Sequence, residues 1–194
     1  EALLRYDIMD TPPESGFDRI TRMAVTVFGA SISTICLVDA NRVWFKSRQG
    51  ITHREKPRAH YFAQKIIEHG DVLTLEGMNE TDRFRDRPFV SSPPGLRFFA
   101  GAPLLTPDKQ IIGAFCIADA KARTLCPTDK TLLAEFAAIV MAEFEGRRLD
   151  RLLRHERDMS HRTALRLTEA THFDPVTGVA NRASFNETLR AVIQ

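Results

Sequence analysis

The sequence predicts an α+β domain, in which helices flank an antiparallel sheet, followed by a long C-terminal helical arm. Three observations support this fold class. Two pairs of apolar segments are each joined by a short turn, which indicates hairpins and so a mostly antiparallel sheet. Amphipathic helical patterns precede the first hairpin and follow the second, so both can cover one face of the sheet. The last of these patterns continues as a regular but highly charged helix to residue 171.

Composition limits the possible functions. The 194 residues suffice for one domain with an appendage or for two small domains. A net charge of +2 gives no reason to expect nucleic acid as a partner. No apolar run approaches the roughly 18 residues that a membrane span needs, and three cysteines without zinc-like spacing suit a reducing cytoplasm. Because the chain begins with Glu1, we expect it to be a piece of a longer protein.

The chain opens with two helical segments. Residues 1–8 are predicted to form a short helical lead-in that stops before Pro12, because proline cannot continue a helix. Ser15 can cap a second helix over residues 17–28, in which apolar side chains recur at three- and four-residue steps. Gly29 is the natural C-terminal stop of that helix.

A hairpin and a third helix come next. Residues 31–38 are continuous and rich in β-branched side chains, which predicts a buried central strand, and residues 42–48 alternate as its hairpin partner. A loop should lead from there to a helix over residues 60–68 and a short strand over residues 72–75. The charged, proline-rich stretch 78–95 is predicted to cross the surface irregularly.

The second hairpin leads into the longest helix. Residues 96–104 and 110–117 are apolar and flank a turn at residues 106–109, which predicts two adjacent strands. From residue 128 to residue 144, apolar side chains recur on one side, so the first half of this helix should lie on the sheet. The second half is too polar for a core helix and too regular for a loop. We therefore expect it to carry a conformational signal.

This arm is expected to pair with a second copy of itself. Two rows of positions seven residues apart form the predicted seam, and six of the ten positions are apolar. The rows are Ala138, Glu145, Leu152, Met159 and Arg166, and Ala142, Leu149, Glu156, Thr163 and Ala170. Charged residues weaken the seam, which suits a switch between two nearly equal registers. We predict a parallel homodimer through residues 144–171, with a lone, partly frayed helix as the alternative.

Several motifs are spread along residues 1–146. They are Tyr6-Asp7-Ile8-Met9-Asp10-Thr11-Pro12-Pro13-Glu14, Phe17-Asp18-Arg19-Ile20-Thr21, Leu37-Val38-Asp39, Trp44-Phe45-Lys46-Ser47, Asp82-Arg83-Phe84, Arg97-Phe98-Phe99-Ala100-Gly101-Ala102-Pro103-Leu104 and Gly113-Ala114-Phe115-Cys116-Ile117-Ala118-Asp119. Together they resemble a bacterial GAF sensor domain. The resemblance implies a sheet in the order 2-1-5-4-3 and a small-molecule pocket on one face. Where this subgroup would have Phe-Cys-x-His, Phe62 and Gln64 replace the cysteine and the histidine, which argues against redox, metal or covalent-chromophore sensing there.

Pocket residues are expected where the third helix meets the second and fourth strands. The candidates are Trp44, Arg58, Tyr61, Phe62, Arg97 and Phe99. An aromatic wall with one or two guanidinium groups suits a small planar or anionic ligand. The alternative is that these side chains only fill the core. The sequence predicts no catalytic residue and no metal site in this chain, and it names no cofactor.

A second resemblance starts at residue 173. The run Asp174-Pro175-Val176-Thr177-Gly178-Val179-Ala180-Asn181-Arg182 is similar to the opening motif of GGDEF domains, Asp-x-Leu-Thr-Gly-Leu-x-Asn-Arg. This resemblance implies a diguanylate cyclase head, which uses Mg²⁺ and condenses two GTP into cyclic di-GMP across a dimer. The catalytic loop and the nucleotide-binding residues are absent, so we expect no catalysis from this chain. Asp174 and Arg182 can pair across a turn and fix the junction between arm and head.

Three functions are therefore open. The predicted organisation is a GAF sensor domain over residues 1–146, a helical linker over 147–171 and the incomplete start of a GGDEF domain over 172–194. The first function is a regulatory and dimerising sensor that controls a diguanylate cyclase through the linker. The alternatives are the sensor of a histidine kinase and a ligand-free protein-interaction module.

Overall fold

The computed structural model describes most of the chain, namely residues 1–58, 62–78, 84, 88–91, 95–172, 179, 181, 185, 190 and 191. It forms two compact units, Glu1–Arg148 and Leu149–Gln194, which are considered separately. Three residues singled out by the sequence, Tyr61, Asp174 and Arg182, lie outside the described residues.

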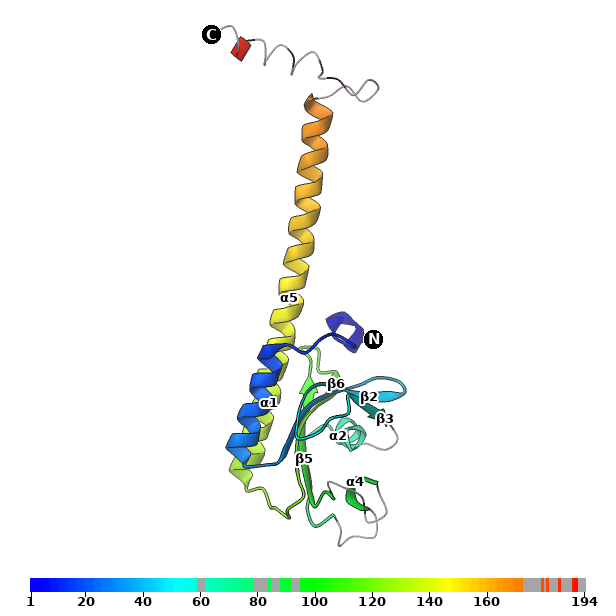
Figure 1. The fold of residues 1–194 in the computed structure, drawn as a ribbon, viewed down its shortest axis with the longest axis vertical. Coiled ribbons are helices and arrows are strands. Elements are labelled where there is room, and N and C mark those ends of the chain that lie inside the picture. The colour runs from blue at the N-terminus through cyan, green and yellow to red at the C-terminus, as the bar shows by residue number, and fades with distance from the viewer. Residues whose placement is uncertain are drawn as a thin grey trace. The chain divides into compact units, whose positions relative to one another are not determined.

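Among the described residues, the first unit forms one six-stranded antiparallel sheet (Figure 1). Its strands are β1 (Ile32–Val38), β2 (Arg42–Gln49), β3 (Glu55–Pro57), β4 (Leu73–Leu75), β5 (Phe98–Leu105) and β6 (Ile111–Asp119). The order β3-β2-β1-β6-β5-β4 contains the five predicted strands in the predicted order. The additional edge strand, β3, was not predicted, because three residues that include a proline are too short to show an alternating pattern.

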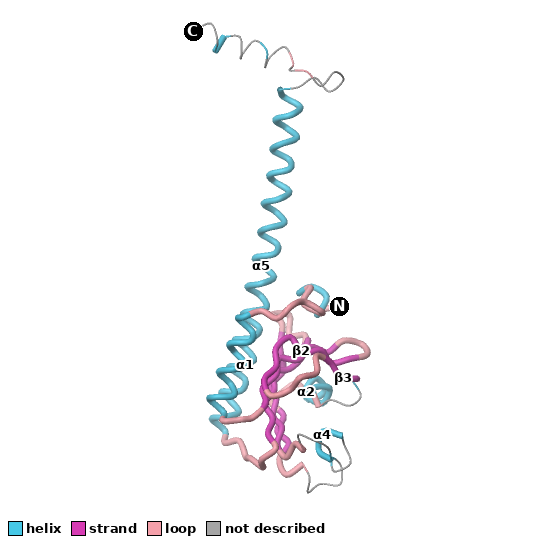
Figure 2. Tube along the Cα trace, viewed as in Figure 1, coloured by secondary structure: helices cyan, strands magenta, loops and turns pink. Residues whose placement is uncertain are grey.

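Helices cover both faces of this sheet. They are the 3₁₀-helix η1 (Leu3–Tyr6), α1 (Ser15–Phe28), α2 (Ala63–His69), α4 (Pro88–Ser91) and α5 (Pro127–His172). Figures 1 and 2 show α1 and the first part of α5 side by side on one face and α2 on the other. The predicted stop at Gly29 is confirmed by its left-handed φ of 59°. The predicted cap at Ser15 is wrong, because Glu14 precedes α1 and makes no side-chain cap bond.

The helix α5 begins with a reciprocal cap that involves a cysteine. The Asp129 carboxylate accepts a hydrogen bond from the backbone N–H of Cys126 at 3.1 Å, and the N–H of Asp129 donates to Cys126 Sγ at 3.4 Å. This arrangement is a capping box in which a sulfur atom takes the place of the usual hydroxyl oxygen. In the part of the chain that the structure describes, no helix combines the length and the apolar character that crossing a membrane requires.

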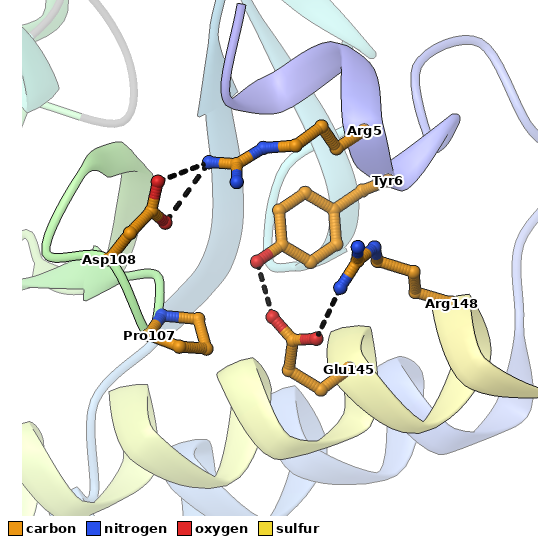
Figure 3. Close-up of a pocket in the computed structure, with 6 residues that line it drawn as sticks. All are labelled: Arg5, Tyr6, Pro107, Asp108, Glu145 and Arg148. Carbon is orange, nitrogen blue, oxygen red and sulfur yellow. Dashed lines mark hydrogen bonds and ion pairs between the residues drawn. The ribbon is translucent and has the colours of Figure 1, made fainter.

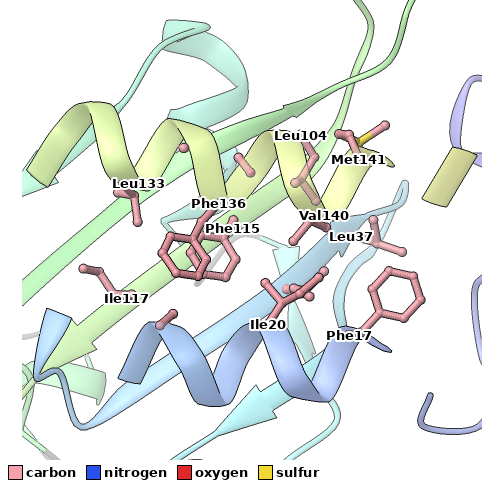
Figure 4. Close-up of a cluster of buried hydrophobic side chains, with 14 of the residues drawn as sticks. Phe17, Ile20, Leu37, Leu104, Phe115, Ile117, Leu133, Phe136, Val140 and Met141 are labelled. Atoms are coloured by element: carbon pink, nitrogen blue, oxygen red, sulfur yellow. The ribbon is translucent and has the colours of Figure 1, made fainter. Parts of the chain in front are cut away.

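The core beneath α1 and α5 contains aromatic contacts between α5 and the sheet and between the two helices (Figure 4). The rings of Phe115 and Phe136 stack with centroids 5.5 Å apart, and those of Phe17 and Phe144 lie 4.7 Å apart. Burial of each such side chain contributes about 1.5–3 kcal/mol. These contacts fix α1 and the first part of α5 on the sheet.

A β-bulge redirects one charged residue of β2. The pairing of β2 with β1 slips by one position at Lys46, and such a bulge re-aims the side chain of the extra residue. The Lys46 side chain is fully buried and reaches the segment before α1. Its ammonium donates hydrogen bonds to Thr11 Oγ1 at 2.8 Å, to the Pro12 carbonyl at 2.8 Å and to Glu14 Oε1 at 2.5 Å.

Candidate functional site

A small cavity lies on the face of the sheet opposite α1 and α5, with a volume of about 40 Å³. It is lined by Ile32, Ile51, His53, Lys56, Phe62, Phe89, Leu96, Phe99 and Ala118. Apolar side chains from β1, β5 and β6 meet Phe62 from the start of α2 there. This volume holds about three water molecules, or a few non-hydrogen atoms of a ligand.

The aromatic wall of the cavity is centred on Phe62. Its ring contacts three other phenylalanine rings, with centroid distances of 5.4 Å to Phe84, 4.4 Å to Phe89 and 4.9 Å to Phe99. The side chain is only 5% exposed. Where the resemblance implies a cysteine, this chain therefore has an aromatic packing centre.

The structure brings together two of the four predicted aromatic candidates. Phe62 and Phe99 meet across the cavity, as expected from where α2 and β5 converge. Trp44 lies on the other face of the sheet, in the core beneath α1 and α5. Neighbouring residues of a strand point to opposite faces, so it is Phe45 that joins the cluster on the cavity side.

The two predicted arginines bind backbone carbonyls and do not line the cavity. Arg58 Nη1 donates to the carbonyl of Asp39 at 3.1 Å, in the turn between β1 and β2. Arg97 Nη1 donates to the carbonyls of Val90 and Leu96, both at 3.2 Å. In the described part of the chain, both guanidinium groups therefore hold loop backbone in place.

The basic groups at the cavity are His53 and Lys56, which the sequence did not single out. Burial lowers the pKa of His53 below its ordinary value of 6.5, and the charges of Lys56 and Arg48 lower it further. Burial also lowers the pKa of Lys56. Both residues fall in the stretch 50–58 that was predicted to be a loop, where the available signal was a run of basic residues.

A second pocket, of about 130 Å³, lies where η1 meets α5 within the first unit (Figure 3). It is lined by Arg5, Tyr6, Pro107, Asp108, Glu145 and Arg148. Its charges are matched internally: Arg5 pairs with Asp108 at 2.7 Å, and Arg148 pairs with Glu145 at 3.3 Å. Arg5 thus joins η1 to the turn between β5 and β6, and the Tyr6 hydroxyl joins η1 to Glu145 of α5, which indicates a structural role in holding η1 in place.

Residues 6–14, called the strap below, connect the sheet with the end of α5 in the first unit. Glu14, besides binding the buried lysine of β2, accepts hydrogen bonds from Arg147 Nε at 3.0 and 3.1 Å. Arg147 Nη1 donates to the Tyr6 carbonyl at 3.1 Å. The Tyr6 hydroxyl donates to Glu145 Oε1 at 2.5 Å. The strap therefore ties the turn of α5 at residues 145–147 to β2.

Replacing Tyr6 with phenylalanine is expected to flatten the loss of stability at alkaline pH. Burial raises the pKa of Tyr6 far above its ordinary value of 10.0, and the hydrogen bond to Glu145 adds to this effect. Above about pH 10, the unfolded state ionises first, so each further pH unit lowers the free energy of unfolding by up to about 1.4 kcal/mol. Urea unfolding of the parent chain and of Tyr6→Phe from about pH 9 to 11 measures how the free energy of unfolding of each depends on pH. Parallel pH curves for the two proteins would contradict this assignment.

Comparison with solved structures identifies the fold. The GAF domain of an Acinetobacter phosphoenolpyruvate-protein phosphotransferase superposes with a TM-score of 0.57 at 13% identity, over 74% of this chain and 90% of that one. Free methionine-R-sulfoxide reductase from Neisseria meningitidis, in complex with its substrate, superposes with a TM-score of 0.58 at 17% identity, over 77% of this chain and 90% of that one. At such identities the likeness concerns the fold alone.

Comparison of sequences extends this result. A cyclic di-GMP phosphodiesterase of Pseudomonas aeruginosa, PA2567, is 31% identical over 188 residues, which are 96% of this chain but only 29% of that protein. The chain thus spans less than a third of the length of this relative. Residues 12–144, well over half of the chain, match the model of the GAF domain. On this match, and on the sheet and helices that accompany it, the chain belongs to the GAF domain family.

Proposed function

We propose that this chain is the sensor part of a cyclic di-GMP signalling protein, in which a small molecule in the cavity biases a helical linker. The observation that carries the proposal is α5, a single helix that packs in the core of the GAF domain from Leu133 to Phe144 and continues to His172. The similarity to the phosphodiesterase covers 96% of the chain and so extends beyond the family match, which ends at residue 144.

The enzyme under control is either a cyclase or a phosphodiesterase. The similar protein is a phosphodiesterase, whereas the cyclase expectation rests on the GGDEF-like run at residues 174–182. We propose the division into a sensor domain over 1–146, a linker over 147–171 and a GGDEF start from 172. In that division, Asp174 and Arg182 would fix the junction between linker and head.

We further propose that the linker forms a parallel homodimer. In the second unit, Leu149, Leu152, Leu153 and Met159 are each about half exposed, at 54, 49, 51 and 50%. Large apolar side chains that recur at helical spacing on a polar helix favour pairing with a second helix. A change of register in this pair would alter how two heads face each other without touching their chemistry.

Deletions in the linker test the proposal in the longer protein that carries this chain. Removing four residues, 149–152, turns everything that follows by about 40° and shortens the helix by about 6 Å. Removing seven, 149–155, keeps the seven-residue phase of the seam. We expect the four-residue deletion to change cyclic di-GMP turnover at least tenfold and the seven-residue deletion to change it less than about threefold.

Both synthesis from GTP and hydrolysis of cyclic di-GMP are measured for each protein, which also identifies the enzyme under control. Equal effects of the two deletions would contradict control through the phase of the linker. Turnover of neither nucleotide by the intact longer protein would contradict the proposed signalling role.

A further inference from the structure

We propose that the cavity binds a small organic monocarboxylate, whose carboxylate is held by His53 and Lys56 and whose apolar body lies against Phe62 and Phe99. This inference rests on the proposed function of the cavity and specifies the chemical class of its ligand. Four features of the first unit support it: unbalanced charge, a half-buried cation, an apolar wall and a small volume.

The first feature is an excess of positive charge beside the cavity. The segment from the end of β2 through β3 carries the basic residues Arg48, His53, Arg54, Lys56 and Arg58. Its one acidic residue is Glu55, and that carboxylate binds Arg42 Nη1 at 2.5 Å. An anion is therefore the ligand that this part of the surface favours.

The second feature is the state of Lys56. Other buried or half-buried cations of the first unit have polar partners: Lys46 faces Glu14 and Arg123 faces Asp119. Arg58 and Arg97 donate to backbone carbonyls. Lys56 is half-buried and lines the cavity, yet no hydrogen bond or ion pair joins its ammonium to any described residue. Burial of a cation without a partner is unfavourable. A ligand carboxylate at the cavity would supply the missing partner.

The third feature is the apolar wall, and the fourth is the size. Besides Lys56 and His53, every described lining residue is aliphatic or aromatic, and none adds a hydroxyl, amide or carboxylate side chain. A volume of about 40 Å³ is far below the roughly 300–1,000 Å³ of sites for drug-sized ligands. Such a volume suits a branched body of about three or four carbon atoms.

The charges around His53 predict how binding depends on pH. Lys56 from β3 and Arg48 from β2 face the imidazole, and the ring of Phe45 packs against it edge-on, at 5.7 Å between centroids. These positive charges favour the neutral imidazole in the empty cavity, whereas a bound carboxylate favours the protonated one. The complex therefore takes up a proton, and affinity should rise as the pH falls from about 7.5 to about 5.5.

Thermal unfolding of the 194-residue chain with isobutyrate and with its neutral analogue isobutyramide tests the proposal. Isobutyrate should raise Tm in proportion to the logarithm of its concentration, by about 5 °C or more at a hundredfold excess over Kd. Isobutyramide should not. Lys56→Met and His53→Gln should each weaken isobutyrate binding at least tenfold. Arg54→Met, in the same basic segment but outside the cavity lining, is the matched control and should bind as the parent chain does.

The outcomes separate this inference from the proposed function. Equal shifts with acid and amide, or an isobutyrate shift that survives both cavity substitutions, would overturn the anionic site. No shift with isobutyrate at any pH would also overturn it, while the linker deletions would still test control of the enzyme independently. Should a cavity variant fail to fold, the pH dependence of isobutyrate binding to the parent chain decides, because an affinity that does not rise on acidification contradicts the role of His53.

Discussion

Substituting both Leu149 and Leu152 with glutamate is expected to abolish self-association of the chain, raising the dimer Kd at least about 100-fold. Each of these leucines is about half exposed in the single chain, at 54 and 49%, and would be buried in the proposed seam. The double substitution removes four apolar side chains per dimer, each worth about 1.5–3 kcal/mol when fully buried, and places four carboxylates in their stead. Sedimentation velocity at tens of micromolar chain measures the fraction of dimer in the parent and in the double variant.

Arg154→Glu is the matched control, because it changes the charge of each chain by the same two units. Residue 154 lies on the opposite side of the helix from residue 152, at about 200° of rotation. Its i,i+4 spacing from Asp150 limits the cost of its loss to a few tenths of a kcal/mol. A monomeric parent chain, or a dimer that tolerates the two glutamates, would exclude pairing through this seam.

Replacing Gly113 with alanine is expected to destabilise the first unit by more than about 3 kcal/mol. A Cβ atom at this position in β6 would stand 2.0 Å from the carbonyl oxygen of Cys36 and 3.0 Å from the Cα atom of Leu37. Both are backbone atoms of β1, which pairs with β6 at these residues. These atoms cannot move away without separating the two central strands of the sheet. Urea unfolding measures the resulting loss in the free energy of unfolding.

Gly146→Ala is the control for this substitution. This glycine lies inside α5, and an added Cβ would have no neighbour within 4 Å. Alanine should stabilise the helix by about 0.5–1 kcal/mol, because glycine loses more backbone entropy on folding. If both substitutions destabilised the chain equally, close approach of β1 and β6 would not be the cause.

The fold was predictable wherever burial repeats with a regular period. The central hairpin strands are buried along most of their length, and the first part of α5 buries one face over many residues, so their patterns are strong. Leu133, Phe136, Val140 and Phe144 are all buried as expected. Leu132 belongs to the same apolar pattern but is 37% exposed. The short elements β3 and α4 span only three and four residues, and no local pattern in the sequence predicts them.

The site was only partly predictable, because the direction of a single side chain depends on local backbone geometry. Phe62 and Phe99 follow from the topology, which brings α2 over β5. The bulge at Lys46 is invisible in the sequence, and strand alternation sends Trp44 away from the cavity. His53 and Lys56 reach the cavity because β3 pairs with β2. No local pattern in the sequence predicts this pairing.

The strap also determines how this sensor could be moved between proteins. A cassette cut where the family match begins, at residue 12, would lose Tyr6 and the backbone that precedes the cut. Arg147 would lose two carbonyl acceptors and Glu145 its hydroxyl donor. These are contacts on the turn of α5 that leads into the linker. A transplanted domain should therefore keep its first eleven residues, because residues 6 and 7 hold Glu145 and Arg147 of α5 in place.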